Sequence, residues 1–377
     1  MSVPVLTTTQ EIEELAAVLA GEGAIAVDLE ADSMHCYQEK VCLLQFSTAD
    51  RTWLVDPLAG PDLAPLGPVL ADPAVRKIFH AADYDLRSLR RDFGLTVRGL
   101  FDTMVAAQFL GEEKIGLADV LLKHFGVELD KQYQRADWAQ RPLPAGMLHY
   151  AAEDTRHLHR LADLFEGELA AKGRLEWAGE EFALLEAVRF QATGEAPLFV
   201  RAKGAAALDR RGLAILELLL QWRDGEARRR DCPLFKVIGT KSLLEIARIR
   251  PRAAKGLVGI EGVPPRLADR YGRELLGCVE EGLAKPEEEL PIFPRGERRL
   301  RDPEVEGRLT KLKEWRSGKA VALAMDPGIV INNATLEELA RQAPRQPEEL
   351  VTVPGLKRWQ QTVLGDELLQ LLQACKV

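Results

Sequence analysis

The first half of the chain carries two kinds of hydrophobic pattern. Short apolar runs that stop at turn-forming or charged residues predict strands over 23–30, 41–47, 52–55 and 76–80. Apolar residues that recur every three or four positions predict helices over 84–93, 103–110, 117–125, 144–165 and 174–193. Strands that come first and then mix with helices predict an α/β domain in which helices flank a sheet of mixed direction.

The second half has no strand-like run and contains an internal repeat. Trp222-Arg223 returns 93 positions later as Trp315-Arg316, and the residues around Gly262 return around Gly355. The repeat predicts two copies of one small all-α helical bundle, with its Trp and Leu positions in the apolar core.

Two segments of linker composition separate these parts. A Gly-, Pro- and Ala-containing stretch lies at 194–207, and a proline- and charge-rich stretch at 286–303. We therefore expect three domains, over 1–195, 205–285 and 304–377.

Composition places the chain among ordinary globular proteins. It is 46% hydrophobic and 29% charged over 377 residues, which excludes a mostly disordered chain. No apolar run approaches the length of a membrane span, and the N-terminus lacks the pattern of a secretory signal. The five cysteines show no CxxC spacing. We interpret them as reduced thiols of a cytoplasmic protein that does not contact membranes.

The net charge of −8 is unevenly distributed. Residues 1–195 hold 18 basic and 32 acidic side chains, whereas residues 196–285 hold 18 basic and 11 acidic ones. An acidic front followed by a basic segment is typical of a carboxylate-rich active site beside a nucleic-acid surface. Ordinary solvated surfaces would give the same composition.

Two pairs of residues have the spacing of a divalent-metal site. Asp28 and Glu30 stand two apart at a strand end, so they share one face. Tyr150 and Asp154 stand four apart on a predicted helix, one turn from each other. Hard cations prefer carboxylate oxygens. Alone, the first pair is more typical of a strand that ends in polar residues, and the second of a surface contact or a core tyrosine.

A further carboxylate, Asp85, follows the fourth predicted strand. Asp83 is the better candidate for the cap of the helix that begins there, so Asp85 has no evident structural task. A solvated helix face is the alternative.

Taken together, these segments resemble the tyrosine-containing subgroup of the DEDD exonuclease superfamily. The order is Asp-x-Glu, then Asp, then Tyr-xxx-Asp. The segment 129–158 (LDKQYQRADWAQRPLPAGMLHYAAEDTRHL) is similar to the corresponding part of ribonuclease D, as are Gln45, His80 and Phe101-Asp102-Thr103. The two helical copies resemble HRDC domains, small units that bind nucleic acid.

The resemblance implies a ribonuclease H-like fold and a 3′→5′ exoribonuclease that releases nucleoside 5′-monophosphates. It implies that tRNA precursors or other structured RNAs with 3′ tails are the substrates, and that the protein is a monomer. By the same resemblance two divalent ions, Mg²⁺ or Mn²⁺, are held by four carboxylates and the attacking water is positioned by Tyr150. The carboxylates are Asp28, Glu30, Asp85 and Asp154.

Substrate contacts are predicted from the matched segments. Lys131, Arg135 and Arg141 are candidates for phosphate contacts, with pairing to surface acids as the alternative. Gln45 and His80 are candidates for the scissile nucleotide, with core packing as the alternative. Trp138 is interpreted as a core residue.

The first helical copy carries the basic excess, including Arg228-Arg229-Arg230 and the alternating arginines of 248–252, and is the expected RNA-contacting copy. Two other functions fit the same residues. One is a single-strand DNA exonuclease, because no residue identifies a contact to the RNA 2′-hydroxyl. The other is a non-catalytic RNA-binding scaffold.

Overall fold

The computed structural model describes residues 3–189, 194, 196–294 and 302–375. It divides into two compact units. One comprises residues 1–31, 41–190 and 300–377, and the other comprises residues 32–40 and 191–299. The predicted bounds of three domains stay a prediction, and the two units are described separately below.

The first unit is built on a six-stranded mixed sheet with the strand order β1-β4-β3-β2-β5-β6. β2 pairs antiparallel with β3 and parallel with β5, which makes it a central strand. The strands are β1 (Val5–Leu6), β2 (Ala24–Ala31), β3 (Val41–Ser47), β4 (Thr52–Val55), β5 (Arg76–Phe79) and β6 (Leu100–Asp102).

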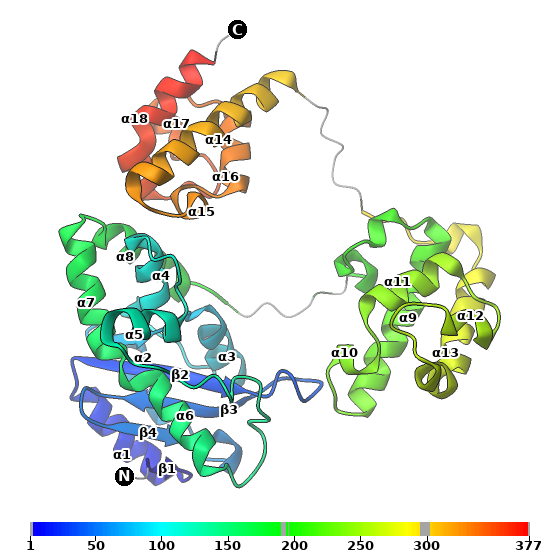
Figure 1. The fold of residues 1–377 in the computed structure, drawn as a ribbon, viewed down its shortest axis with the longest axis horizontal. Coiled ribbons are helices and arrows are strands. Elements are labelled where there is room, and N and C mark those ends of the chain that lie inside the picture. Colours follow the sequence, from blue (N-terminus) through cyan, green and yellow to red (C-terminus); the bar gives the residue numbers. More distant parts are fainter. Residues whose placement is uncertain (1–2, 190–193, 195, 295–301, 376–377) are drawn as a thin grey trace. The chain divides into compact units, whose positions relative to one another are not determined.

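Helices flank this sheet, as the sequence predicts. They are α1 (Thr9–Ala20), α2 (Gly67–Ala71), α3 (Asp83–Phe93), α4 (Thr103–Leu110), α5 (Leu117–Phe125), α6 (Ala145–Arg156), α7 (Leu158–Ala171) and α8 (Leu175–Glu186). α6 lies across β2, β3 and β4 (Figure 1), where Ser47 Oγ is 2.6 Å from Thr155 Oγ1. Ser47 pairs with Ala26, two residues before Asp28, so α6 covers the face that carries Asp28 and Glu30.

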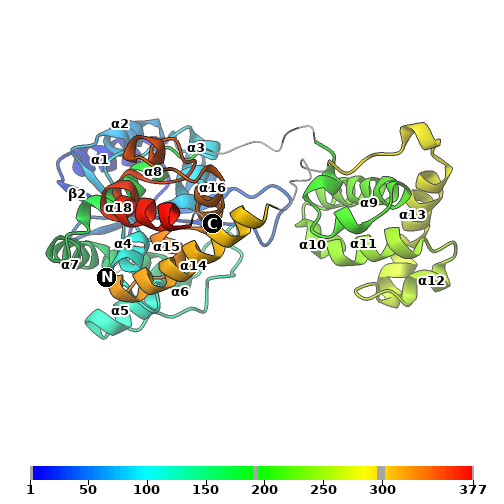
Figure 2. The same ribbon diagram turned by 90° about the horizontal axis from the view of Figure 1, so that it is seen from above.

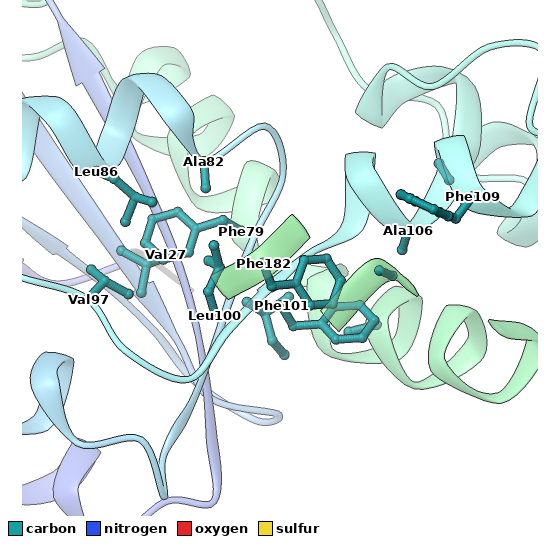
Figure 3. Packing of buried hydrophobic residues seen from close by; sticks show 14 of the residues in the cluster. Val27, Phe79, Ala82, Leu86, Val97, Leu100, Phe101, Ala106, Phe109 and Phe182 are labelled. Carbon is teal, nitrogen blue, oxygen red and sulfur yellow. The ribbon is translucent and has the colours of Figure 1, made fainter. Parts of the chain in front are cut away.

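Apolar side chains from the sheet and its helices form one core. Figure 3 shows Val27 and Phe79 of the sheet near Leu86 of α3, and Phe101 of β6 against Phe182 of α8. The ring centroids of Phe101 and Phe182 are 5.0 Å apart. This packing anchors the strand ends from which the acidic residues project.

Five details differ from the predicted elements. The helices α1 and α2 were not predicted. The strands β1 and β6 were not predicted, because two or three residues are too few to show a period. The predicted helix over 144–165 is two helices that meet at His157. The last helix of this region ends at Glu186 rather than Thr193, which lies outside the described residues. The N-cap position of α3 is Ala82 rather than Asp83, which instead pairs with Arg87.

The second helical copy belongs to the same unit. Its helices are α14 (Pro303–Leu323), α15 (Pro327–Val330), α16 (Asn333–Gln342), α17 (Pro347–Leu350) and α18 (Arg358–Ala374). Trp359 stacks on Trp177 of α8, with ring centroids 4.9 Å apart and planes 12° apart. Arg174 donates to the carbonyl oxygens of both Phe109 and Leu323, each at 2.6 Å. An apolar and polar seam therefore joins this copy to the α/β part.

The second unit contains the first helical copy. Its helices are α9 (Arg210–Arg229), α10 (Leu234–Val237), α11 (Thr240–Ile249), α12 (Ala254–Val258) and α13 (Pro265–Ala284). Figure 2 shows α9 packed between α11 and α13.

The predicted repeat is confirmed, because equivalent arginines make equivalent contacts. Arg223 donates to Ile238 O and Thr240 Oγ1, and Arg316 donates to Ile331 O and Asn333 Oδ1. Within the described residues, no helix of either unit is long and apolar enough to cross a membrane.

Candidate metal and catalytic site

The central strand β2 places two carboxylates on one face. Asp28 and Glu30 alternate with the buried Val27 and Leu29, whose side chains enter the opposite side of the sheet. β2 leaves its regular pairing with β3 directly after Glu30. The two acids therefore lie where the regular β2–β3 pairing ends, under the last turns of the covering helix α6.

Helix α6 brings the third carboxylate to the same place. Ligand oxygens of Asp28, Glu30 and Asp154 lie within 4.8 Å of one another. Tyr150 precedes Asp154 by one helical turn, and its hydroxyl is near enough to the Asp154 carboxylate to oppose part of the rise in the pKa of that acid. The structure thus unites residues that lie more than 120 positions apart in the sequence.

Asp85 enters the site from the first turn of α3. It is 6% exposed, and the negative charge of Asp28 raises its pKa in addition to burial. Asp102 also contributes to this rise. Asp85 therefore does not lie on a solvated helix face, which was the alternative considered from the sequence.

Asp102 has a role that sequence reasoning missed. Its carboxylate accepts the backbone N–H groups of Ala81 and Ala82, which lead into α3, at 3.1 and 2.8 Å. It also accepts the N–H of Met104 at the start of α4. Asp102 thus fixes the backbone that leads into α3, the helix that carries Asp85, and the start of α4. The available signal was an Asp-Thr pair directly before a predicted helix.

Burial raises the pKa of each of the four acids, and the charge of Asp28 adds to the rise at the other three. Burial raises the pKa of Asp28 to about 7 and, with the charge of Asp28, that of Asp154 to about 8. Burial and the charges of Asp28, Asp154 and Asp85 raise the pKa of Glu30 to about 10. Divalent cations relieve this repulsion by replacing the protons. The oxygen-only ligand set fits Mg²⁺ or Mn²⁺.

Gln45 is buried beside this site, and His80 is half-buried directly after β5. Gln45 is fully buried and stands opposite Asp28 in the β2–β3 pair, and neither of its side-chain polar atoms has a hydrogen-bond partner among the described residues. His80 Nδ1 is 2.9 Å from Thr103 Oγ1, while its Nε2 is buried and unpartnered within the same part of the chain. Burial lowers the pKa of His80, which favours the neutral ring.

Comparison with known proteins agrees with this geometry. The 3′-5′ exonuclease family model matches residues 3–170, and the HRDC domain model matches residues 212–279 and 305–372. Ribonuclease D of Granulibacter bethesdensis is 31% identical over 97% of this chain and 91% of its own length. Ribonuclease D of Gluconacetobacter diazotrophicus is 33% identical over 98% of this chain and 92% of its own.

The chain belongs to the ribonuclease D family. The crystal structure of Escherichia coli RNase D matches it with a TM-score of 0.74 and 27% identity, over 99% of both chains. The predicted resemblance, the fold class and the enzyme class, a 3′→5′ exoribonuclease, are confirmed.

The three basic residues predicted to contact phosphates differ in their own contacts. Lys131 is exposed and 3.9 Å from Asp119, and Arg135 is exposed too. Arg141 is bonded bidentately to Asp56 and also to three backbone carbonyl oxygens. These contacts favour the alternative of pairing within the protein for Arg141. Trp138 is 1% exposed, as expected of a core residue.

The arginines of the first HRDC copy are also engaged internally. Arg229 pairs with Glu226, Arg248 with Glu245 and Arg250 with Asp209. These three arginines are therefore paired with acids of the same copy.

Proposed function

We propose that this exoribonuclease trims RNA from the 3′ end by hydrolysis, with two divalent cations held by Asp28, Glu30, Asp85 and Asp154, and releases nucleoside 5′-monophosphates. The observation that carries the proposal is the convergence of the oxygens of Asp28, Glu30 and Asp154 within 4.8 Å. When bound, two Mg²⁺ or Mn²⁺ ions supply charge compensation at the entering and leaving oxygens and lower the pKa of a bound water.

The protein's own side chains orient the reactants. Burial and the surrounding acids raise the pKa of the Tyr150 phenol, which therefore stays protonated at neutral pH. A protonated phenol orients the attacking water through a hydrogen bond and is no base. Gln45 and His80 offer unpartnered polar atoms to water or to the terminal nucleotide. Lys131 and Arg135 are the remaining candidates for phosphate contacts.

We infer that the substrates are tRNA precursors or other structured RNAs with 3′ tails, acted on by a cytoplasmic monomer. The related Escherichia coli protein is described as an exoribonuclease involved in structured RNA processing, which supports this substrate class. The first HRDC copy, with 18 basic and 11 acidic residues over 196–285, is the proposed RNA-contacting copy. Removing residues 200–285 is then expected to weaken RNA binding and its salt dependence.

The proposal is tested with 5′-labelled RNA that has a single-stranded 3′ tail, incubated with Mg²⁺, Mn²⁺ or EDTA. We expect a metal-dependent ladder that shortens from the 3′ end, abolished in Asp28→Ala and retained in Asp50→Ala, an exposed acid between β3 and β4. Tyr150→Phe is expected to lose most of the rate but to keep metal binding.

Two outcomes would contradict the proposal. Intact RNA in every lane with binding retained in a gel shift would favour the scaffold function. Faster digestion of a DNA oligonucleotide of the same sequence would favour the DNA exonuclease.

A further inference from the structure

The ring of Tyr150 packs against two other aromatic rings. Trp138 lies with its centroid 6.0 Å away at 40°, and Tyr133 meets it edge-on at 6.0 Å and 72°. Both come from the segment between α5 and α6. Gly146, in the first turn of α6, allows this approach, since a Cβ there would lie 2.6 Å from the Tyr133 hydroxyl oxygen. Tyr150 is therefore fixed by contacts outside its own helix.

Trp138 is buried in the packing around Tyr150. It is 1% exposed, and its Nε1 has no hydrogen-bond partner among the described residues. A buried indole N–H without a partner costs free energy that a phenylalanine or leucine at this position would avoid. The indole thus packs against Tyr150 although its N–H is left without a partner there within the described part of the chain.

Arg141 fastens the backbone of Trp138 to the sheet. Its Nη1 donates to Trp138 O at 2.8 Å, and its Nη2 donates to Cys42 O of β3 at 2.8 Å. Its Nε and Nη2 also form two hydrogen bonds of 2.6 Å with the Asp56 carboxylate, directly after β4. A planar guanidinium with this many partners holds the segment rigidly. An arginine available for a phosphate contact would instead be free of such partners.

We propose that Trp138 is a positioning residue for Tyr150, and that Arg141 and Asp56 hold Trp138 in place. The inference rests on the proposed role of Tyr150 in orienting the attacking water. Without the indole, Tyr150 gains rotamers that point its hydroxyl away from the water near Asp154. The chemical step slows, whereas RNA and metal binding change little, because neither involves Trp138.

A double-mutant cycle tests this coupling on the full chain, with Trp138→Leu, Tyr150→Phe and both together, assayed with single-stranded RNA under saturating Mg²⁺. We expect Trp138→Leu to lower kcat by roughly tenfold to 10²-fold with little change in KM. Trp138→Phe should restore most of the loss. In the Tyr150→Phe background, Trp138→Leu should have no further effect on kcat, because the hydroxyl that it positions is gone.

A buried tryptophan elsewhere serves as the matched control. Trp53 of β4 is 6% exposed and belongs to the main apolar core of the sheet and its helices. Trp138 belongs to a separate apolar cluster, which includes the neighbouring Leu54. Trp53→Leu should lower Tm and leave kcat of the folded enzyme unchanged. If Trp138→Leu does not fold, Tyr133→Leu takes its place in the cycle, since it removes the other ring from Tyr150.

The outcomes distinguish a failure of the positioning role of Trp138 from a failure of the proposed role of Tyr150. An equal kcat loss from Trp138→Leu with and without the Tyr150 hydroxyl would overturn the positioning role while the proposed function stands. A Tyr150→Phe enzyme as fast as wild type would overturn the role of Tyr150, and the inference with it. Loss of the Trp138→Leu effect in the Tyr150→Phe background supports both.

Discussion

Gln45 stands directly opposite Asp28 on neighbouring antiparallel strands, fully buried and with no hydrogen-bond partner for its amide among the described residues. An unpartnered buried amide costs about 1–3 kcal/mol of folding free energy. Because it stands beside a carboxylate of the candidate metal site, we expect the amide to hydrogen-bond to a bound water or to the RNA.

Gln45→Leu is therefore expected to raise Tm and to lower kcat/KM by roughly 10²-fold. The leucine removes an uncompensated polar group, and with it a hydrogen bond that forms only when the site is loaded. Thermal melts and initial rates on labelled RNA measure the two effects.

Gln360 is the matched control, because it is buried to 2% exposure and its Nε2 donates to Val330 O at 2.7 Å. Gln360→Leu should lower Tm and leave the rate of the folded enzyme unaltered. A Gln45→Leu enzyme that is as fast as wild type would show that the amide only packs.

The stability of the metal-free protein should depend on pH through the acidic site. Carboxyl groups of the unfolded chain titrate near pH 4. In the folded chain, burial raises the pKa of Asp28 to about 7, and burial together with neighbouring negative charges raises the pKa of Asp154 to about 8 and of Glu30 to about 10. The folded state then binds more protons than the unfolded state in this window. Its free energy of unfolding falls as pH rises from about 4 through these values.

The measurement is Tm in EDTA between pH 5 and 9, for wild type and for Glu30→Gln, which cannot ionise. We expect Glu30→Gln to become more stable than wild type as the pH rises. The Tm gain from Mg²⁺ in wild type should also grow with pH, because fewer protons must be displaced. Parallel curves of Tm against pH for both proteins in EDTA would show that ionisation of Glu30 does not destabilise the metal-free fold.

Gly111 should be essential for seating the second HRDC copy. Its φ is +84°, and a Cβ there would lie 1.9 Å from the carbonyl oxygen of Ala324. Gly126 also has a positive φ, of +67°, but open space around it. Alanine at either position costs about 1–2 kcal/mol from the backbone conformation alone.

Gly111→Ala should therefore lower the free energy of unfolding distinctly more than Gly126→Ala, because the new methyl group also displaces the backbone at Ala324. Urea unfolding of both variants gives the comparison. Equal losses would mean that the seam accommodates a methyl group.

Trp359 should contribute most of the apolar stabilisation of the same seam. It is 5% exposed, stacks on Trp177 and meets Phe109 edge-on at 5.5 Å. Trp359→Ala is expected to cost about 3–5 kcal/mol, as for other buried aromatic residues. The equivalent position of the first copy is the exposed Arg266, where Arg266→Ala should be nearly neutral. Calorimetry that finds both variants equally stable would contradict this assignment.

Much of the fold is predictable because its signals are local. The strand over 41–47 and the helices over 103–110 and 117–125 appear where the periodicity places them. Strands of two or three residues carry no period, so β1 and β6 were missed. The cap of α3 was mispredicted because the chain leading into the helix is held by Asp102, a carboxylate from a distant strand end that binds the amides of Ala81 and Ala82.

The sequence by itself determined the family, the repeat and the identity of the candidate ligands, because spacing on a strand or helix decides which side chains share a face. Only the tertiary structure decided what each of these side chains meets. It brings Asp154 beside Asp28 and Glu30. It commits Arg141 to Asp56 and to the backbone of Trp138 rather than to solvent. Burial and hydrogen-bond partners come from elements remote in the chain, and local periodicity carries no record of them.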